Sequence, residues 1–456
     1  MDRQVSLPAG RVVRIGGASG AWGDSATAVP QLLGAGVDYL VFDYLAELTM
    51  AILAGARAKN PDLGYATDFV DTVAAHLPTI VEKRVRLVSN AGGVNPLACA
   101  TAIRAAAERL GLAPKIAVVT GDDVTPLLPA LREEGMRDMA TGAPMPAKLS
   151  SANAYLGALP IAAALAAGAD IVVTGRCVDS AVTLGPLIHE FGWAAGDYDR
   201  LAAGSLAGHI IECGCQATGG LFTDWREVPG WVRMGYPIVE VSADGGFVVA
   251  KPSGTGGLVT PATVAEQILY EIGDPAAYVL PDVICDFRQV RLEQVGPDRV
   301  SVVDARGRAP TGSYKVCATW ADGFRSRAEL TIVGFEAVAK ARRTADAILA
   351  RTRAMFREAG LADYSRVNVE VLGAEQPYGA AGAEPSLREA LLRLSVAHPD
   401  RRALDIFARE IAPAGLSWAP GTTGLGGRPK AQPDMRLFSF LIDRRRLSPR
   451  VEIDGH

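Results

Sequence analysis

The amino-acid sequence predicts an α/β fold, with a Rossmann-like, mostly parallel sheet in its N-terminal part and an α+β domain in its C-terminal part. Two observations lead to this prediction. In the first half of the 456-residue chain, short apolar runs alternate with segments whose apolar residues recur three and four positions apart. Such alternation is typical of a parallel sheet with helices on both faces. Beyond about residue 230, hairpin patterns replace it.

In the N-terminal part, short apolar runs are expected to form the parallel strands. They are Arg11–Gly17, Val37–Tyr44, Val85–Asn90, Lys115–Thr120 and Ile171–Gly175. Helices are expected where apolar residues recur with helical spacing. These segments are Ala46–Lys59, Pro96–Leu110, Asn153–Ala167 and Ser180–Phe191. Gly111 and Gly168 stand where two of these helices should end.

The C-terminal part begins with alternating apolar residues on both sides of Asp244-Gly245-Gly246, which indicates a hairpin. Further helices are expected at Thr263–Ile272, Phe335–Glu358, Ser386–Ser395 and Arg401–Ile411. Further strands are expected at Val300–Val303, Tyr314–Thr319, Glu329–Val333, Arg366–Leu372 and Met435–Ile442. A stretch rich in Gly and Pro between 270 and 285 predicts two domains, 1–275 and 276–456. The Arg-rich final fifteen residues are expected to be a loose tail.

Composition excludes several classes of protein. Apolar residues make up 49% of the chain, enough for a large core, and the formal net charge of −4 disfavours binding to duplex nucleic acid. Six cysteines are too few for a disulfide scaffold, and the N-terminus lacks the apolar run of a signal peptide. The most apolar stretch, Leu156–Val173, is broken by Pro160, Gly168 and Asp170. We therefore expect a cytoplasmic protein that binds neither nucleic acid nor a membrane.

A glycine-rich turn, Gly16–Asp24, follows the first expected strand. Backbone N–H groups of such a turn can hold an anion, which makes Gly17, Ser19 and Gly20 candidate ligand-binding residues. The spacing matches neither G-x-G-x-x-G nor a P-loop, so it is a weak sign of NAD and argues against Walker-type use of ATP. Tight packing of the strand on the helix is the competing interpretation. Asp24 is expected to cap a helix that begins at Ser25.

Polar residues also follow the other expected strands. Because ligands bind beyond the carboxyl ends of parallel strands, these residues are expected to line a cleft. The candidate ligand-binding residues there are Asn90, Gly92, Gly93, Asn95, Asp122 and Arg176. Asp43 and Asp179, which follow the second and fifth strands, are candidate acid–base groups. Each aspartate taken alone could equally be a helix cap.

Two further motifs could carry chemistry. Glu212-Cys213-Gly214-Cys215 ends a helix that contains His209, and Glu212 is a third candidate acid or base. Small buried residues at a helix end are the alternative, and a metal site is another, although no second Cys/His pair lies at finger spacing. We predict no metal. The second motif is a loop that could hold a phosphate or carboxylate. Its candidate residues are Lys251, Gly254, Thr255 and Gly256.

Ordered blocks of this sequence resemble the acyclic terpene utilisation family AtuA, over at least residues 11–285. The blocks are RIGGASGAWGD, VDYLVFDYLAELTMAILA, GYATDFV, LVSNAGGVNP, VVTGDDV, SANAYLGALPIAAALAAGADIVVTGRCVDSA, GPLIHEFGW, AGHIIECGCQATGG, YPIVEV, KPSGTGG and VAEQILYEIGDPAAYVLPDV. The resemblance implies a role in acyl-CoA or carboxylic-acid catabolism. It also implies a small ferredoxin-like domain, which some members append and others meet as a separate protein. This chain is expected to lack the appended domain and to take a small partner.

Together these features predict an enzyme of acyl-CoA or hydroxy-acid catabolism, a lyase or hydratase acting on a branched or hydroxylated acyl substrate. No cofactor is evident, and a CoA thioester is a candidate substrate. A homo-oligomer is expected. Two alternatives stay open: a nucleotide-dependent oxidoreductase, favoured only by the fold and the first glycine-rich turn, and a non-catalytic subunit that needs a small partner.

Overall fold

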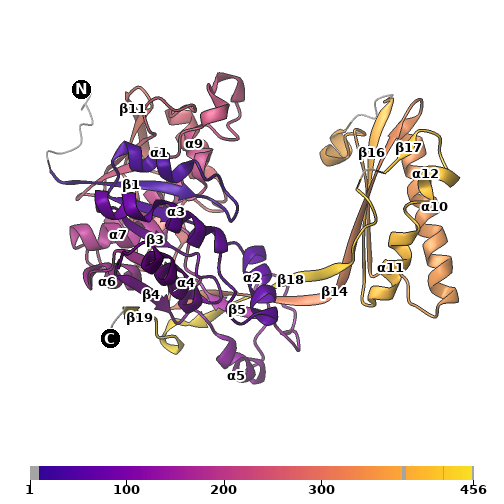
Figure 1. Cartoon of the computed structure of the whole chain (residues 1–456), viewed down its shortest axis with the longest axis horizontal. Coiled ribbons are helices and arrows are strands. Elements are labelled where there is room, and N and C mark those ends of the chain that lie inside the picture. Colours follow the sequence, from indigo (N-terminus) through magenta and orange to yellow (C-terminus); the bar gives the residue numbers. More distant parts are fainter. Residues whose placement is uncertain (1–9, 383–386, 425, 454–456) are drawn as a thin grey trace. The chain divides into compact units, whose positions relative to one another are not determined.

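The computed structural model of the protein describes residues 10–382, 387–424 and 426–453. The chain divides into two compact units (Figure 1). Unit 1 comprises residues 1–319 and 437–456, and unit 2 comprises residues 320–436. The boundary expected from the sequence, near residue 275, therefore falls inside unit 1. The chain leaves unit 1 within strand β14 (Ser313–Val333) and returns within β18 (Gln432–Asp443).

The centre of unit 1 is a block of parallel strands. In spatial order it comprises β1 (Val12–Ser19), β2 (Tyr39–Phe42), β3 (Arg86–Ser89), β6 (Ile171–Thr174) and β4 (Ile116–Thr120). Each neighbouring pair in this block is parallel, so the carboxyl ends of these strands lie along one edge. This block confirms the expected strands and the α/β class. The more specific Rossmann-like assignment stays a prediction.

Antiparallel strands extend the block on both sides into a 10-stranded mixed sheet. Beyond β1 lie β7 (Ile238–Ser242), β8 (Phe247–Ala250), β12 (Arg299–Val303) and β11 (Arg291–Gly296). Strands β7 and β8 are the hairpin expected around Asp244-Gly245-Gly246. On the other side, β19 (Arg450–Ile453) pairs with β4. The expectation of a loose C-terminal tail is therefore wrong for 450–453, because the ladder with β4 holds these residues.

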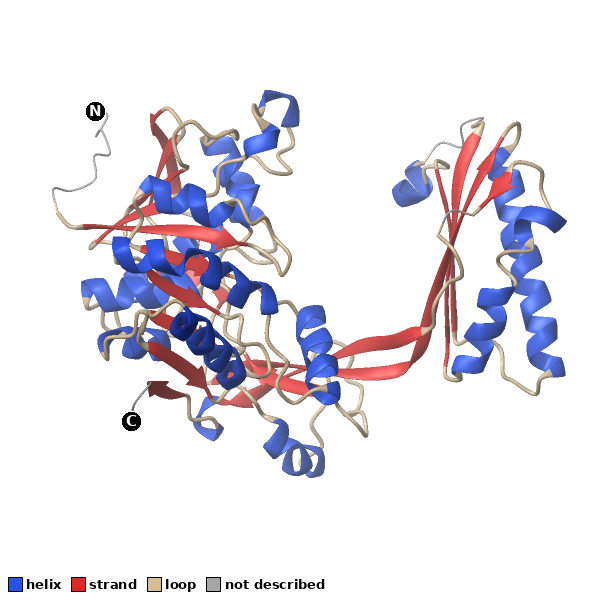
Figure 2. Ribbon diagram, viewed as in Figure 1, coloured by secondary structure: helices blue, strands red, loops and turns tan. Residues whose placement is uncertain are grey.

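Helices cover both faces of this sheet (Figure 2). Strand β2 shows how: Tyr39 and Val41 join a core with α6, α7 and α8, whereas Leu40 and Phe42 join a core with α1, α3 and α4. The helices of unit 1 are α1 (Ala28–Ala35), α2 (Glu47–Lys59), α3 (Thr67–Lys83), α4 (Pro96–Arg109), α5 (Leu128–Glu133), α6 (Leu159–Ala166), α7 (Ala181–Phe191), α8 (Tyr198–Ile211) and α9 (Pro261–Leu269).

Smaller elements complete unit 1. Strand β5 (Ser151–Ala154) pairs with β14 through Val316–Thr319, so the helix expected from Asn153 begins only at Leu159. A separate sheet contains β13 (Arg306–Arg308), β10 (Ile284–Asp286) and β9 (Tyr278–Val279). The short 3₁₀ turns are η1 (Thr125–Leu127), η2 (Gly214–Thr218), η3 (Trp225–Glu227), η4 (Trp231–Arg233) and η6 (Arg444–Arg446).

Unit 2 is an antiparallel sheet with helices packed on one face. Its strand order is β15 (Arg366–Leu372), β16 (Glu389–His398), β14 and β17 (Thr422–Thr423). Helices α10 (Ala337–Glu358), α11 (Arg401–Arg409) and α12 (Ala414–Ser417) contribute to its core, and η5 is Gln376–Ala381. The helix expected at 386–395 is wrong over 389–395, which lie in β16. Ala390, Leu392, Leu394 and Val396 alternate into the core, and pairing on both sides overrides the helix-favouring composition.

Candidate functional site

The carboxyl ends of the parallel strands place the predicted acid–base groups at one edge of unit 1. Asp43 follows β2, Arg176 and Asp179 follow β6, and Glu212 follows α8. The charges of Asp179, Glu212 and Arg176 all act on Asp43, so the structure brings these four residues into one electrostatic group. We call this group the carboxylate centre.

Asp43 is the most constrained member of the carboxylate centre. Its side chain is only 8% exposed, and its Oδ1 accepts hydrogen bonds from Asn90 Nδ2 at 2.5 Å and from the Leu45 N–H at 3.2 Å. The N–H of Tyr44 donates to Asn90 Oδ1 at 2.8 Å, which fixes the amide. Burial and the nearby carboxylates of Asp179 and Glu212 raise the pKa of Asp43 well above its ordinary value, despite opposition from Arg176 and Asn90. The surroundings therefore shift Asp43 toward its protonated form.

Arg176 supplies the positive charge at the centre. It is 4% exposed, pairs with Asp179 Oδ1 at 2.8 Å and lies 4.1 Å from the centre of the Tyr155 ring. Burial alone would lower the pKa of Arg176, but Asp179, Tyr155 and Asp43 outweigh it and raise that pKa. The guanidinium therefore stays charged. Asp179 remains 32% exposed, so solvent reaches the centre at its carboxylate.

Glu212 forms a buried pair with His209, three residues earlier on α8. His209 Nδ1 lies 2.9 Å from Glu212 Oε1, and both side chains are buried. Burial raises the pKa of Glu212 to about 7, with His209 opposing the rise. Burial lowers the pKa of His209, but Glu212 outweighs it and leaves that pKa raised. The pair can therefore exchange a proton near neutral pH.

The thiols beside this pair are held in their neutral form. Burial raises the pKa of both Cys213 and Cys215 to about 12. Over the part of the chain that the structure describes, no group of three or more His, Cys, Asp and Glu residues is arranged to hold a metal ion. The geometry at Glu212 thus favours proton transfer over thiolate chemistry.

Asp122 lies behind Arg176 and positions it. Asp122 Oδ2 accepts from the Arg176 N–H and from Asn153 Nδ2, both at 2.8 Å. A Cβ on Gly175 would collide with the same carboxylate. Asp122 is 4% exposed, and burial raises its pKa to about 6. Its carboxylate holds the backbone of the β6 end, so its predicted ligand contact gains no support from the geometry.

The first glycine-rich turn packs closely against the end of α8. A Cβ on Gly17 would meet the Ile211 carbonyl oxygen at 2.5 Å, and one on Gly20 would meet the Cys213 carbonyl carbon at 2.6 Å. These contacts explain the glycines without an anion. Ser19 Oγ donates to the Ala21 carbonyl at 2.8 Å.

Asp24 does not cap a helix at Ser25, because α1 begins at Ala28. It instead closes the turn that precedes α1. The Gly20 N–H donates to Asp24 Oδ2 at 2.9 Å, and the Tyr236 hydroxyl donates to Asp24 Oδ1 at 2.6 Å. The expectation of a cap is therefore wrong, because the carboxylate is occupied by the turn and by Tyr236.

The candidate residues in the segment after β3 have two different roles. Asn90 joins the carboxylate centre, whereas Asn95 donates to the carbonyls of Pro61 and Leu63 at 2.9 and 2.8 Å. A Cβ on Gly92 would collide with the Thr174 carbonyl, and Gly93 has a φ of +55° beside Leu53. The structure thus brings Asn90 to the centre and uses Gly92, Gly93 and Asn95 in packing.

The loop of Lys251 is satisfied internally. Lys251 Nζ contacts Asp298 Oδ2 and the Thr255 carbonyl, both at 3.0 Å, and its side chain is 5% exposed. Thr255 Oγ1 donates to the Pro252 carbonyl at 2.5 Å, and a Cβ on Gly256 would collide with the Gly230 carbonyl. Gly254 has open space around it. The lysine is committed to Asp298, so the loop offers no unpaired cation to a phosphate.

Sequence reasoning missed three residues beside Arg176. Tyr155 covers the guanidinium and donates its hydroxyl to Glu47 Oε1. Lys315 Nζ lies 3.8 Å from the same Glu47 oxygen and 5.0 Å from the centre of the Tyr155 ring. These residues are more than a hundred positions apart, so no local pattern relates them. Tyr155 does fall within one of the blocks that resemble the family.

The family model for the acyclic terpene utilisation family protein AtuA matches residues 13–453 of this chain. The chain belongs to the AtuA family. No curated protein and no solved structure matches it. Across the described residues of this AtuA-family chain, no helix combines the length and apolarity needed to cross a bilayer. Its lyase chemistry, its small partner, its oligomeric state and its location in the cytoplasm stay predictions.

Proposed function

We propose that this AtuA-family protein is an enzyme of acyl-CoA or hydroxy-acid catabolism that adds water to, or removes it from, a branched or hydroxylated acyl substrate. One observation supports this most directly: two buried carboxyls with raised pKa values, Asp43 and Glu212, share the carboxylate centre with one buried guanidinium. Reversible dehydration needs a base and an acid in one protected place. The position beyond the carboxyl ends of parallel strands suits a ligand.

The proposed roles follow from the protonation states. Glu212, whose pKa is about 7, takes the proton from the carbon next to the acyl carbonyl. Asp43, whose pKa is raised by burial, gives its proton to the hydroxyl on the next carbon, which leaves as water while the carbon–carbon double bond forms. The reverse sequence adds water. His209, beside Glu212 at 2.9 Å, holds the base in position and shares its proton.

Arg176 has a different role in this scheme. Its guanidinium is already paired with Asp179 and covered by Tyr155, so it is committed to the protein before substrate arrives. Its positive charge offsets the negative charge of the carboxyl groups of Asp179 and Asp43. It therefore positions and stabilises the carboxylates, and it is not the main anchor for a substrate carboxylate.

The test uses a panel of 3-methylcrotonyl-CoA, crotonyl-CoA, 3-hydroxybutyryl-CoA and the corresponding free acids. We expect at least one compound to interconvert with its hydrated or dehydrated partner, and in D₂O to gain deuterium at the carbon next to the carbonyl. Glu212→Gln and Asp43→Asn should each lower turnover by at least ~100-fold. Glu293→Gln, an exposed matched change in the same unit, should leave turnover unaltered.

Two results would contradict the proposal. One is turnover by Glu212→Gln and Asp43→Asn at the wild-type rate with the fold intact. The other is a native protein that neither converts nor exchanges any compound of the panel. Activity that appears only when a small second protein is added would support the alternative of a subunit that needs a partner.

A further inference from the structure

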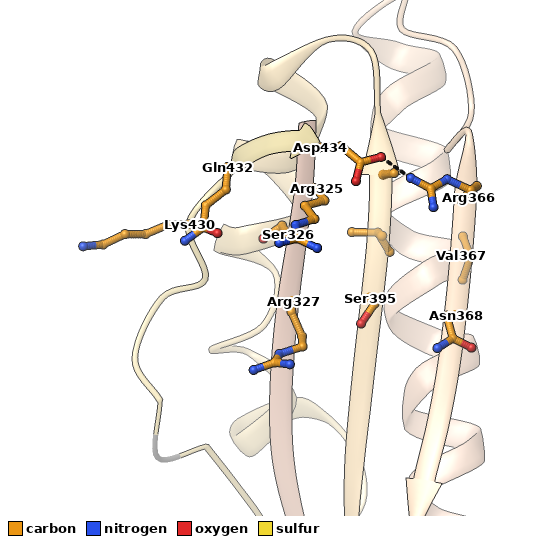
Figure 3. Close-up of a pocket in the computed structure, with 12 residues that line it drawn as sticks. Arg325, Ser326, Arg327, Arg366, Val367, Asn368, Ser395, Lys430, Gln432 and Asp434 are labelled. Atoms are coloured by element: carbon orange, nitrogen blue, oxygen red, sulfur yellow. Dashed lines mark hydrogen bonds and ion pairs between the residues drawn. The ribbon is translucent and has the colours of Figure 1, made fainter. Parts of the chain in front are cut away.

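We propose that unit 2 carries a separate binding site for a small ligand with a pyrophosphate group, on the sheet face opposite α10 and α11. The site is a cavity of about 780 Å³ lined by β14, β15, β16 and the start of β18 (Figure 3). We call it the basic trough. The proposal is independent of the carboxylate centre and stands whether or not that centre is catalytic.

The strand register shows how the trough is built. Arg325 lies opposite Ala397, which lies opposite Arg366 on the far side. In the next row on this face, Arg327 lies opposite Ser395, and Ser395 opposite Asn368. Directly opposed residues point to the same face of a sheet. The small Ser395 and Ala397 therefore form a floor between two rows of longer polar side chains.

The opposite face of the same strands is apolar. Ala328, Leu394 and Val396 belong to the buried core with α10 and α11. Because side chains alternate along a strand, the arginines and the polar floor must lie on the face without these helices. Farther along this face, Arg393 pairs with Glu329 at 2.9 Å and with Glu370 at 3.4 Å. In this row the two glutamates neutralise the arginine, so the positively charged part of the face ends there.

Several polar groups in the trough are uncommitted. Within the described residues, Arg325, Lys430, Asn368 and Ser395 have no side-chain hydrogen bond or ion pair. Arg327 has only a 3.7 Å contact with Glu329 on its own strand. Arg366 pairs with the buried carboxylate of Asp434, which fixes its guanidinium (Figure 3). The lining thus offers one positioned and three loosely held cations against a single carboxylate.

This chemistry fits a pyrophosphate best. Arginine guanidiniums bind phosphate oxygens with two parallel hydrogen bonds, and Asn368 and Ser395 can donate further bonds from the floor. A cavity of about 780 Å³ falls in the range of small-molecule sites. None of the described residues that line the trough is aromatic, so these residues offer no platform on which single-stranded nucleic acid could stack. The pyrophosphate could come from a nucleoside diphosphate or from coenzyme A.

The experiment measures binding to the full chain by calorimetry. Inorganic pyrophosphate, ADP and coenzyme A are the probes, and adenosine is the phosphate-free comparison. We expect saturable binding of pyrophosphate, weakened by added salt, and none of adenosine. Tighter binding of ADP than of coenzyme A identifies a nucleotide, and the reverse identifies the CoA moiety. Either order supports the proposal.

A double variant tests the location. Arg325→Gln with Arg327→Gln should weaken pyrophosphate binding by roughly tenfold or more, since each arginine lost removes charge-assisted bonds. Arg343→Gln with Arg401→Gln removes the same charge from exposed positions on α10 and α11 and should change binding little. Equal binding by the two double variants would overturn the proposal. So would absence of saturable binding by all three phosphate probes, or tighter binding of single-stranded RNA or of an acidic peptide.

Discussion

The carboxylate centre and the basic trough are both clusters of charged residues, but they differ in their exposure to solvent. At the centre, Asp43, Arg176 and Glu212 are buried, and each shifts the pKa of another. In the trough, Arg325 and Lys430 are exposed to solvent. Low local dielectric strengthens interactions at the centre, whereas solvent screens those in the trough. Burial thus makes one cluster suited to proton transfer and leaves the other suited to recognition.

The first prediction compares the two clusters through one substitution. Arg176→Met removes the buried cation that is hydrogen-bonded to Asp179 and should lower the free energy of unfolding by about 1–3 kcal/mol. Arg325→Met removes an exposed cation that has no partner among the described residues and should change it by at most about 0.5 kcal/mol. Urea unfolding at neutral pH measures both. Equal effects would show that the centre is wetter than its burial indicates.

The same contrast explains how much could be predicted from the sequence. Asp43 and Asp179 were predictable because each follows an apolar strand, and the carboxyl ends of parallel strands meet at one edge. Tyr155 and Lys315 were not predictable. Tyr155 directly follows β5 and covers Arg176, and Lys315 on β14 contacts the Tyr155 ring, but β5 and β14 pair only in the folded chain. Local patterns locate strand ends, whereas side chains from elsewhere complete the site.

The trough was hidden for a related reason. Its middle strand, β16, contains Glu, Ala, Leu and Arg, which favour helix, so 386–395 were expected to be helical. The decisive signal was the two-residue alternation of Ala390, Leu392 and Leu394, which Leu391 obscures. With β16 taken for a helix, Arg325, Ser395 and Arg366 could not be placed in neighbouring rows. The wrong prediction for β16 therefore prevented the sheet face that carries the trough from being predicted.

The second prediction concerns Asp122, whose pKa burial raises to about 6. A raised carboxyl pKa gives stability that is present at low pH and is lost as pH rises through the folded-state value. Asp122→Asn does not titrate. Its stability relative to wild type should therefore increase by about 2 kcal/mol between pH 4 and 7. Urea unfolding across this range gives the difference at each pH.

Asp400 in unit 2 provides the opposite sign. Its carboxylate is partly exposed and bonded to Arg402, which lowers the pKa of Asp400 below its ordinary value. The stability that Asp400 contributes is present above its ordinary pKa and is lost as pH falls. Asp400→Asn should therefore be less stable than wild type at neutral pH, and this difference in the free energy of unfolding should shrink as pH falls. If the stabilities of Asp122→Asn and Asp400→Asn relative to wild type changed in the same direction with pH, the assigned difference in solvation between the two carboxyl groups would be contradicted.

The third prediction tests whether the glycine-rich turn is packed or kept open for a ligand. Gly20→Ala places a Cβ 2.6 Å from the Cys213 carbonyl carbon, where backbone must move, and should cost about 1–3 kcal/mol of stability. Gly55→Ala is the matched control: Gly55 lies inside α2 with nothing within 4 Å of its Cβ position, so it should stabilise by about 0.5–1 kcal/mol.

The two glycine variants also separate packing from ligand binding. If Gly20 serves packing, its alanine variant loses stability whether or not a substrate is present. If the turn instead holds an anion, Gly20→Ala keeps wild-type stability and binds the CoA thioesters of the panel less well. The contact with Cys213 joins this turn to the segment beside Glu212. A loss of stability in Gly20→Ala but not in Gly55→Ala would therefore show that the turn packs against the segment beside Glu212. Through this packing the turn would help to hold the base of the carboxylate centre in position.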